Sequence, residues 1–235
     1  MTYAVGPTRE GMDPPLAVDI DGTLTGPDRG LDPRVLPALR EWDAPVVLAT
    51  GKALPYPVGL CEFLAMPTNV IAENGGVVAV SGRDDLVFDG DRAAADRVVA
   101  DYGEAGYDLG WEGIDFVNRW RETEVAVSLD APLEPLERIA ADHGLEVVDT
   151  GFAYHVKSPD VDKGTGLRTA ADGLGLEPSD FAAVGDSEND AETFDVAGAS
   201  YAVANADATA RAAADVVLEQ SYGDGFLAAL DRIRA

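Results

Sequence analysis

The chain has 235 residues, 46% of them hydrophobic and 7% aromatic, which is the composition of a globular protein with an ample core. Its 43 acidic residues outnumber 17 basic ones and give a net charge of −26, so nucleic acid and anionic membranes are not expected partners. No apolar run approaches the roughly 20 residues of a membrane helix, and the single cysteine, Cys61, excludes an internal disulfide and fits a reducing cytoplasm.

The first predicted element is a short buried strand, Leu16 to Ile20, that carries a carboxylate inside its apolar run. Burying the ionised carboxylate of Asp19 is costly unless a metal, a cation or hydrogen bonds compensate it. Asp21 is two residues away, so on extended backbone both carboxylates project to the same side. A turn at Asp21-Gly22 would satisfy Asp21 through local amides, but it does not explain Asp19. The pair suits a metal-assisted nucleophile with a second carboxyl group beside it.

Strands and helices are expected to alternate at both ends of the chain. Residues 1–15, rich in Gly, Pro and charge and without the pattern of a signal peptide, are expected to form a loose arm. The further strands are expected at 45–50, 69–72, 77–80, 124–129, 145–148, 152–156, 181–184, 200–204 and 216–218. The helices are expected at 31–42, 53–65, 91–105, 132–143, 163–175, 189–196, 206–214 and 225–233.

This alternation predicts an α/β fold with a Rossmann-like core, in which helices cover both faces of a mostly parallel sheet. The middle of the chain differs, because residues 84–154 form a separate pattern of helices and strands. We expect these residues to form a small α+β domain inserted into a core made of residues 1–83 and 155–235.

Polar residues follow two more of the predicted strands and open one helix. Thr50-Gly51 supplies a hydroxyl and a backbone amide after one strand, and Gly185 to Asp190 supplies Asp186 and Asp190 after another. Lys163 opens a helix. Ligands of open α/β sheets bind outside the carboxyl ends of the strands, so one site with carboxylates, a hydroxyl and a cation is predicted. Taken singly, these segments also fit a turn, a helix N-cap and a solvated lysine.

Together, Asp19-Ile20-Asp21-Gly22-Thr23, Thr50-Gly51, Lys163 and Gly185-Asp186-Ser187-Glu188-Asn189-Asp190 resemble the four motifs of the haloacid dehalogenase superfamily. The resemblance spans nearly the whole chain. The insertion between Thr50 and Lys163 and the segment Glu73-Asn74-Gly75-Gly76 resemble the subgroup with a type-two cap domain. The segment Arg121-Glu122-Thr123-Glu124 and the short cap are most similar to archaeal-type phosphoglycolate phosphatases.

The resemblance implies a phosphomonoester hydrolase that acts through an aspartyl-phosphate. Asp19 would be the nucleophile, and Asp21 the acid that protonates the leaving oxygen and then activates water. Mg²⁺ would be held by Asp19, the backbone carbonyl of Asp21, Asp186 and Asp190. Thr50, Gly51 and Lys163 would bind the phosphoryl group. The role of Lys52 is open, and both histidines, outside the motifs, are expected to be structural.

The cap is expected to select the substrate, a small phosphorylated metabolite. The segment Asn118 to Arg121 concentrates positive and aromatic character, and Arg121, or else Arg119, is the predicted contact for the carboxylate of 2-phosphoglycolate. The alternative is that these arginines balance nearby acids. The competing functions are a sugar-phosphate phosphatase or a phosphomutase with the same site, and a phospho-accepting receiver module; the oligomeric state stays open.

The acidic residues are dispersed along the chain, not gathered in a tail, which indicates a folded protein with an acidic surface. We interpret this surface as an adaptation to molar salt, where the Debye length falls to about 3 Å and self-repulsion is screened. The alternative is charge that serves solubility alone.

Overall fold

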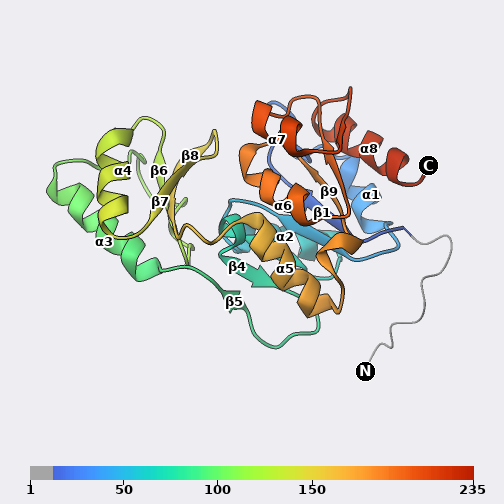
Figure 1. The fold of residues 1–235 in the computed structure, drawn as a ribbon, viewed down its shortest axis with the longest axis horizontal. Helices are drawn as coiled ribbons and strands as arrows, with labels where there is room; N and C mark the ends of the chain where they lie inside the picture. Colours follow the sequence, from blue (N-terminus) through green and yellow to red (C-terminus); the bar gives the residue numbers. More distant parts are fainter. Residues whose placement is uncertain (1–12) are drawn as a thin grey trace.

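The computed structural model describes residues 13–235. The predicted loose arm, residues 1–15, lies outside the described residues apart from 13–15. Those three residues are bound to the core: Asp13 accepts a hydrogen bond from Nε of Arg234 at 2.9 Å, and the carbonyl of Pro14 accepts one from the Trp42 indole at 2.8 Å. Two lobes of unequal size make up the molecule, with the smaller built from the middle of the chain (Figure 1).

The strands are β1 (Leu16–Asp19), β2 (Val46–Ala49), β3 (Val70–Ala72), β4 (Val77–Ala79), β5 (Val87–Phe88), β6 (Val125–Ser128), β7 (Glu146–Asp149), β8 (Ala153–Lys157), β9 (Ala182–Gly185), β10 (Ala199–Ala202) and β11 (Val216–Val217). The α-helices are α1 (Val35–Arg40), α2 (Pro55–Leu64), α3 (Arg92–Glu104), α4 (Leu133–Asp142), α5 (Lys163–Leu174), α6 (Ala191–Val196), α7 (Ala208–Ala213) and α8 (Tyr222–Ile233). Short 3-10 turns lie at η1 (Glu73–Gly75), η2 (Pro178–Asp180) and η3 (Glu188–Asp190).

The larger lobe is built on an eight-stranded sheet with the order β11-β10-β9-β1-β2-β3-β4-β5. Strands from β11 to β3 pair in parallel, and β4 pairs antiparallel with both β3 and β5. Every residue of β1, β2 and β9 is buried. Apart from Asp19 at the end of β1, these central strands are short apolar runs, the pattern of strands covered on both faces. The α/β core predicted from the sequence is confirmed.

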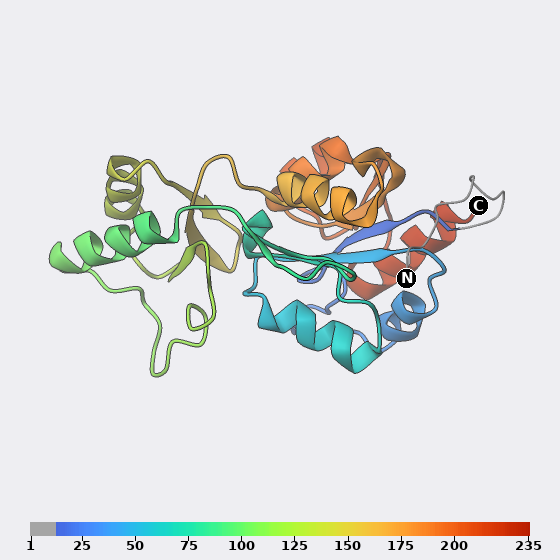
Figure 2. The ribbon, with the colours of Figure 1, turned by 90° about the horizontal axis from the view of Figure 1, so that it is seen from below.

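Helices cover both faces of this sheet (Figure 2). Leu16 and Val18 of β1 pack in one apolar cluster with side chains of α1, α2 and α8, while Ala17 between them packs in another with side chains of α5, α6 and α7. This alternation follows from the two-residue period of a strand. Among the described residues, no helix has both the length and the apolar character to cross a membrane.

The smaller lobe, which we call the cap, has a three-stranded antiparallel sheet in the order β6-β8-β7. Its helices α3 and α4 pack on one face, where Val125, Val127 and Val156 join their apolar side chains. The intervening residues of β6 and β8 project from the opposite face. Figure 1 shows that this second face is directed toward the larger lobe.

The strand pairing gives the cap different first and last elements from those implied by the predicted boundaries of 84–154. β5 lies within that range but pairs with β4 in the large sheet, and β8 extends beyond residue 154 while belonging to the small sheet. The cap elements therefore run from Arg92 to Lys157. The strand β5 was not expected, because two half-exposed apolar residues carry too little pattern.

Candidate active site

The three central strands of the large sheet end side by side, and each delivers a polar side chain at its carboxyl end. Asp19 is the last residue of β1, Thr50 follows β2, and Asp186 follows β9; β1 lies between the other two strands. Lys163 joins them from the first turn of α5, where Asp162 forms a capping box with Thr165. The predicted convergence of these segments is present in the structure.

Asp19 and Lys163 form a buried ion pair. The ammonium of Lys163 donates to Oδ1 of Asp19 at 2.7 Å, to Oδ1 of Asp190 at 2.7 Å and to Oδ1 of Asn189 at 3.1 Å. Burial disfavours the charged ammonium, but the carboxylates of Asp19 and Asp190 outweigh it and raise the pKa of Lys163 above its usual range. Lys163 is therefore a fixed positive charge at the end of β1.

A cluster of carboxylates beside Lys163 fits a divalent cation. Oxygen atoms of Asp19, Asp186 and Asp190 lie within 4.8 Å of one another. Oδ2 of Asp19 is buried and has no hydrogen-bond partner within residues 13–235. Such an oxygen is costly to bury unless a cation compensates it. Carboxylate oxygens are ligands that Mg²⁺ takes from proteins.

The pKa values of two of these carboxyl groups reflect the same crowding. Burial, then the charge of Asp190, raises the pKa of Asp186 to about 7. Burial also raises the pKa of Asp19 well above its usual value, even though Lys163 opposes the shift. Burial and mutual repulsion thus disfavour ionisation of both groups, and a bound cation would favour it.

Two glycines of the motifs are required by the close approach of these acids. Gly22 has a φ of +86°, and a Cβ built on it would lie 2.0 Å from Oδ2 of Asp186. A Cβ on Gly185 would lie 2.5 Å from the carboxylate of Asp190. That carboxylate instead accepts hydrogen bonds from the amides of Asp186 at 2.9 Å and Ser187 at 3.1 Å.

Asp21 lies apart from the carboxylate cluster and contacts the segment after β2. Its Oδ1 accepts a hydrogen bond from the Lys52 ammonium at 2.5 Å, and its Oδ2 accepts one from the Thr50 hydroxyl at 3.3 Å. Its side chain is 34% exposed, in contrast to the buried Asp19. Within the described chain, the Gly51 amide donates to no protein acceptor. The two aspartates thus occupy different environments, and Lys52 has a partner that the sequence did not show.

Arg121 is not placed at the site, contrary to the sequence-based expectation. Its side chain is only 2% exposed and forms an ion pair with Glu124, while its Nε donates to the carbonyl of Val117 at 3.1 Å. The carboxylate of Glu124 therefore compensates the charge of Arg121 inside the cap, because a buried guanidinium requires a carboxylate partner. The alternative interpretation, an arginine that balances a nearby acid, describes Arg121. Arg119 is exposed and does not line the cavity described below.

A buried polar network joins the cap to the site. Asn74 lies in the turn between β3 and β4 with a φ of +53°. Its side-chain Nδ2 donates to Oε2 of Glu124 at 3.1 Å, and its side-chain Oδ1 accepts a hydrogen bond from Nδ2 of Asn189 at 3.0 Å. Oε1 of Glu124 lies 2.7 Å from Nδ1 of His155. His155, predicted to be structural, therefore lies next to the site, on the cap-sheet face opposite α3 and α4.

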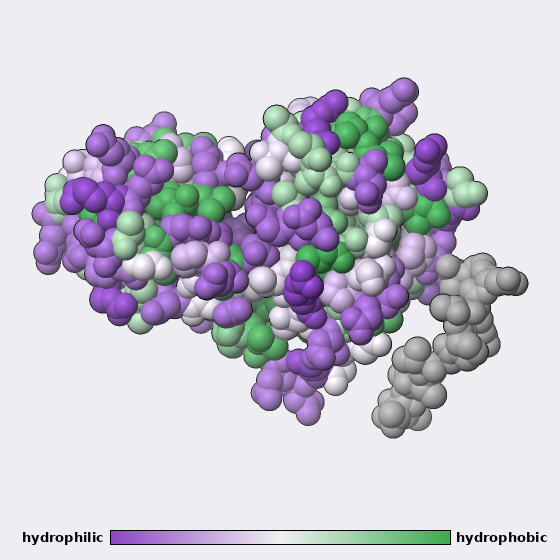
Figure 3. All heavy atoms as spheres, in the orientation of Figure 1, coloured by the Kyte–Doolittle hydropathy of each residue, from purple (hydrophilic) through white to green (hydrophobic). Residues whose placement is uncertain are grey.

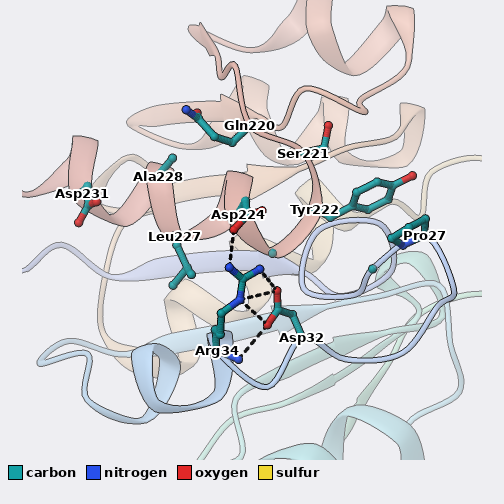
Figure 4. Close-up of a pocket in the computed structure, with 12 residues that line it drawn as sticks. Pro27, Asp32, Arg34, Gln220, Ser221, Tyr222, Asp224, Leu227, Ala228 and Asp231 are labelled. Atoms are coloured by element: carbon teal, nitrogen blue, oxygen red, sulfur yellow. Dashed lines mark hydrogen bonds and ion pairs between the residues drawn. The ribbon is translucent and has the colours of Figure 1, made fainter.

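Between core and cap lies a small cavity of about 90 Å³ that opens to solvent, lined by Asp19, Asp21, Arg29, Gly51, Lys52, Thr150, Phe152, His155, Asp186, Ser187 and Asn189. A larger cavity, of about 510 Å³, lies near the start of α8 (Figure 4). It contains none of the motif residues, and its Arg34 is paired with Asp32 and Asp224. The small cavity contains Asp19, Asp21, Gly51 and Asp186 of the motifs, while Lys163 lines a neighbouring cavity of about 300 Å³. In the small cavity, Arg29 and His155 are contributions that sequence analysis missed.

Known proteins with similar sequences and structures show the family of the chain. Residues 137–230 match the family model of haloacid dehalogenase-like hydrolases. The chain is 64% identical over 223 residues to a phosphoglycolate phosphatase of Natronomonas pharaonis, covering 95% of this chain and 99% of the relative. It is 61% identical over 217 residues to a phosphoglycolate phosphatase of Haloarcula marismortui, covering 92% of this chain and 96% of the relative.

A crystal structure of a Thermoplasma acidophilum protein has the same fold, with a TM-score of 0.82 at 23% identity over 94% of this chain and 98% of that one. The sequence matches extend over both lobes and nearly the whole length of each relative. The chain belongs to the phosphoglycolate phosphatase family of haloacid dehalogenase-like hydrolases.

Proposed function

We propose that this protein hydrolyses 2-phosphoglycolate to glycolate and phosphate, with Mg²⁺ as cofactor and Asp19 as nucleophile. The observation that carries the chemistry is the buried Asp19, with one oxygen paired to Lys163 at 2.7 Å and the other without a hydrogen-bond partner among residues 13–235. The substrate is inferred from the names of the relatives at 64% and 61% identity. The phosphoryl end of the substrate would bind in the cavity that Asp19, Asp21 and Gly51 line.

In this proposal Asp19 attacks phosphorus and forms an acyl-phosphate bond as the ester bond to the glycolate oxygen breaks. Lys163 stays protonated and neutralises charge on Asp19 and on the phosphoryl oxygens. The Thr50 hydroxyl and the uncommitted Gly51 amide bind phosphoryl oxygens at the opposite side of the cavity floor. Fixed donors of this kind hold the phosphorus in line with the nucleophile.

Asp21 is proposed as the general acid and base. Its carboxyl group donates a proton to the leaving glycolate oxygen and then takes one from the water that cleaves the acyl-phosphate, which regenerates Asp19. The exposure of its side chain, 34%, supports this role, since the group must exchange protons with solvent. Lys52, at 2.5 Å, orients the carboxylate toward the cavity.

Mg²⁺ would be held by Asp19 and Asp186, with Asp190 as a direct or water-mediated ligand and the backbone carbonyl of Asp21 completing the set. Bound there, it would reduce the repulsion between a carboxylate nucleophile and a phosphate dianion. Asp190 also positions Lys163, because its Oδ1 accepts from the ammonium at 2.7 Å. The lone, buried Cys61 supports the proposal of a reducing, cytoplasmic location.

Phosphate release from a panel of monoesters tests the proposed function. We expect Mg²⁺-dependent hydrolysis of 2-phosphoglycolate at a higher kcat/KM than of hexose phosphates, and no measurable turnover by Asp19→Asn. Circular dichroism of the Asp19→Asn variant controls for its fold. Preference for a hexose phosphate would contradict the substrate, whereas turnover by Asp19→Asn would contradict the nucleophile.

A further inference from the structure

The cavity above the carboxylates is lined by one arginine, Arg29, whose charge has no acidic partner within the described part of the chain. We propose that Arg29, in the loop after β1, binds the carboxylate of the substrate and so selects 2-phosphoglycolate over monoesters that lack a carboxylate. The inference rests on the proposed function, because it assigns a residue to the part of the substrate that is not phosphate.

The other cations of the site already have acidic partners. Lys163 is buried between Asp19 and Asp190, and Lys52 lies 2.5 Å from an oxygen of Asp21. Within residues 13–235, the Arg29 guanidinium has no ion pair with an acid and donates no hydrogen bond. In a chain of net charge −26, where acids are abundant, an arginine left without one at the active-site cavity is available for an anionic ligand.

Arg29 is nevertheless held in place. Its guanidinium carbon lies 4.4 Å from the centre of the Phe152 ring, a cation–π contact that joins the core to the cap. Phe152 in turn stacks on Trp111 at 6.0 Å, and the Trp111 indole donates to the carbonyl of Ala126 at 2.9 Å. An aromatic ring orients a guanidinium without consuming its N–H donors. Although Arg29 is exposed, this contact favours one orientation of the guanidinium at the cavity.

The backbone of Arg29 is also unusual. Its φ is +67°, in the left-handed region that costs a non-glycine residue free energy. A tight turn fixes this conformation, since the Arg29 amide donates to the carbonyl of Gly26 at 2.9 Å. Arg34, further along the same loop, is instead paired with Asp32 and Asp224 (Figure 4). The loop therefore keeps one arginine neutralised at its outer side and presents the other, unpaired, to the cavity.

The chemistry of the guanidinium matches the ligand. Its planar fork of N–H donors fits a carboxylate in two parallel hydrogen bonds. In 2-phosphoglycolate only one methylene carbon separates the carboxylate from the ester oxygen, so both anionic ends must lie within one small cavity. Arg29 and the phosphoryl-binding residues Gly51 and Asp19 line the same cavity of about 90 Å³. With the phosphoryl group at Asp19 and Gly51, this placement leaves the carboxylate to Arg29.

Steady-state kinetics on two substrates test the role of Arg29. The pair is 2-phosphoglycolate and 2-hydroxyethyl phosphate, which has a hydroxymethyl group in place of the carboxylate. For Arg29→Ala we expect kcat/KM for 2-phosphoglycolate to fall roughly 10- to 100-fold, mainly through KM, as for loss of a hydrogen bond between charged groups. Hydrolysis of 2-hydroxyethyl phosphate should be unchanged, which also shows that the variant is folded.

Arg29→Lys should lose part of the preference, because it retains the charge without the fork. Arg119→Ala is the matched control, since it removes an exposed arginine that does not line the cavity, and it should leave both substrates unaffected. An equal loss on both substrates in Arg29→Ala, or an unchanged KM for 2-phosphoglycolate, would overturn the role of Arg29 alone. A wild-type enzyme that hydrolyses 2-hydroxyethyl phosphate but not 2-phosphoglycolate would overturn the proposed substrate as well.

Discussion

At the scale of single residues, the site is organised around the cost of burying Asp19. One oxygen of this carboxylate is paired with Lys163, and the other is left without a protein donor in the described chain. Asp186 and Asp190 bring two more acids within 4.8 Å. Such a concentration of acids is unfavourable in the metal-free protein and becomes favourable when a divalent cation is bound.

This arrangement predicts a pH-dependent effect of Mg²⁺ on stability. The pKa of Asp186 is raised from 3.8 to about 7 on folding, and that of Asp19 is raised as well. A raised carboxyl pKa means that the folded state holds protons that the unfolded state has released. Without metal, the free energy of unfolding should therefore fall as pH rises from about 4 to about 7.

Mg²⁺ should reverse this loss, because it binds the ionised carboxylates. Thermal melts at pH 5 and pH 8, with and without Mg²⁺ at constant ionic strength, measure the effect. The gain in Tm from Mg²⁺ should be larger at pH 8, by roughly 2–4 °C for each kcal/mol of added stability. Asp186→Asn is the control and should lose most of the gain. An equal gain at both pH values would contradict the assignment of these acids.

Arg121 is expected to contribute to stability through its buried ion pair with Glu124. Its guanidinium and the Glu124 carboxylate are 2% and 1% exposed. Arg121→Ala would leave Glu124 with less compensation, at an expected cost of about 3–5 kcal/mol. Urea denaturation measures this cost, and the exposed Arg119→Ala, expected within about 0.5 kcal/mol of wild type, is the control. An Arg121→Ala variant as stable as wild type would contradict this role.

At the scale of elements, the turn between β3 and β4 joins the core sheet, the cap and α5. Glu73 and Asn74 both have a positive φ, and the buried Glu73 carboxylate accepts hydrogen bonds from the amides of Glu122 and Thr123. Gly75, with a φ of +106°, lies directly against the chain that opens α5. This turn thus holds the cap in register with the helix that carries Lys163.

Gly75→Ala should therefore destabilise the protein strongly. A Cβ at this position would lie 1.9 Å from the carbonyl oxygen of Asp162, and the positive φ adds strain of about 1–3 kcal/mol. Gly59→Ala, inside α2 with nothing within 4 Å of the added carbon, is the matched control and should be neutral or gain up to about 1 kcal/mol. Thermal melts that show equal effects of the two substitutions would contradict the proposed role of the turn.

The elements that the sequence predicts are those with a pattern longer than a few residues. The buried strands β1, β2 and β9 were expected because each is an apolar run that ends in polar residues. The helix expected from residue 31 begins only at Val35, since Leu31 bridges to Thr25 instead. The helix expected from residue 225 begins already at Tyr222. The sequence did not predict this start because Gly223 and Gly225 are poor helix formers, and close contacts require glycine at both positions.

The residues of the candidate site also fall into two groups, those that the sequence predicts and those that it does not. Asp19, Asp21, Thr50, Lys163, Asp186 and Asp190 are predictable because they belong to motifs at strand ends and at a helix start. Arg29 and His155 are not, since their place at the cavity depends on how the cap docks on the core. The expected position of Arg121 was wrong for the same reason. Its ion pair with Glu124, three residues further on, depends on the fold of the cap and cannot be predicted from the sequence alone.

At the scale of the whole molecule, the net charge of −26 is spread over both lobes, and Figure 3 shows hydrophilic residues across the visible face of each. Self-repulsion of this size favours expansion of the chain in dilute buffer. Relatives at 64% and 61% identity come from halophilic archaea. Both observations support an acidic surface adapted to high salt.

The Tm of the protein should rise steadily with KCl toward molar concentrations, because the Debye length shortens from about 10 Å at 0.1 M to about 3 Å at 1 M. Melts in KCl and in an equal osmolality of sucrose separate screening from excluded-volume effects. A Tm independent of KCl would contradict the adaptation and leave solubility as the role of the charge.

Detection of the covalent intermediate tests the central claim, that Asp19 is the nucleophile, most directly. Asp21→Asn lacks the base that activates water, and 4-nitrophenyl phosphate, whose leaving group needs no proton, bypasses the acid that the variant also lacks. Acid-quenched reactions of this variant with 4-nitrophenyl phosphate and Mg²⁺ should therefore accumulate a phosphoryl group on the peptide that contains Asp19. Tandem mass spectrometry locates the modified residue. The account predicts phosphorylation of Asp19 that depends on Mg²⁺ and is absent in Asp19→Asn; phosphorylation at another residue would contradict it.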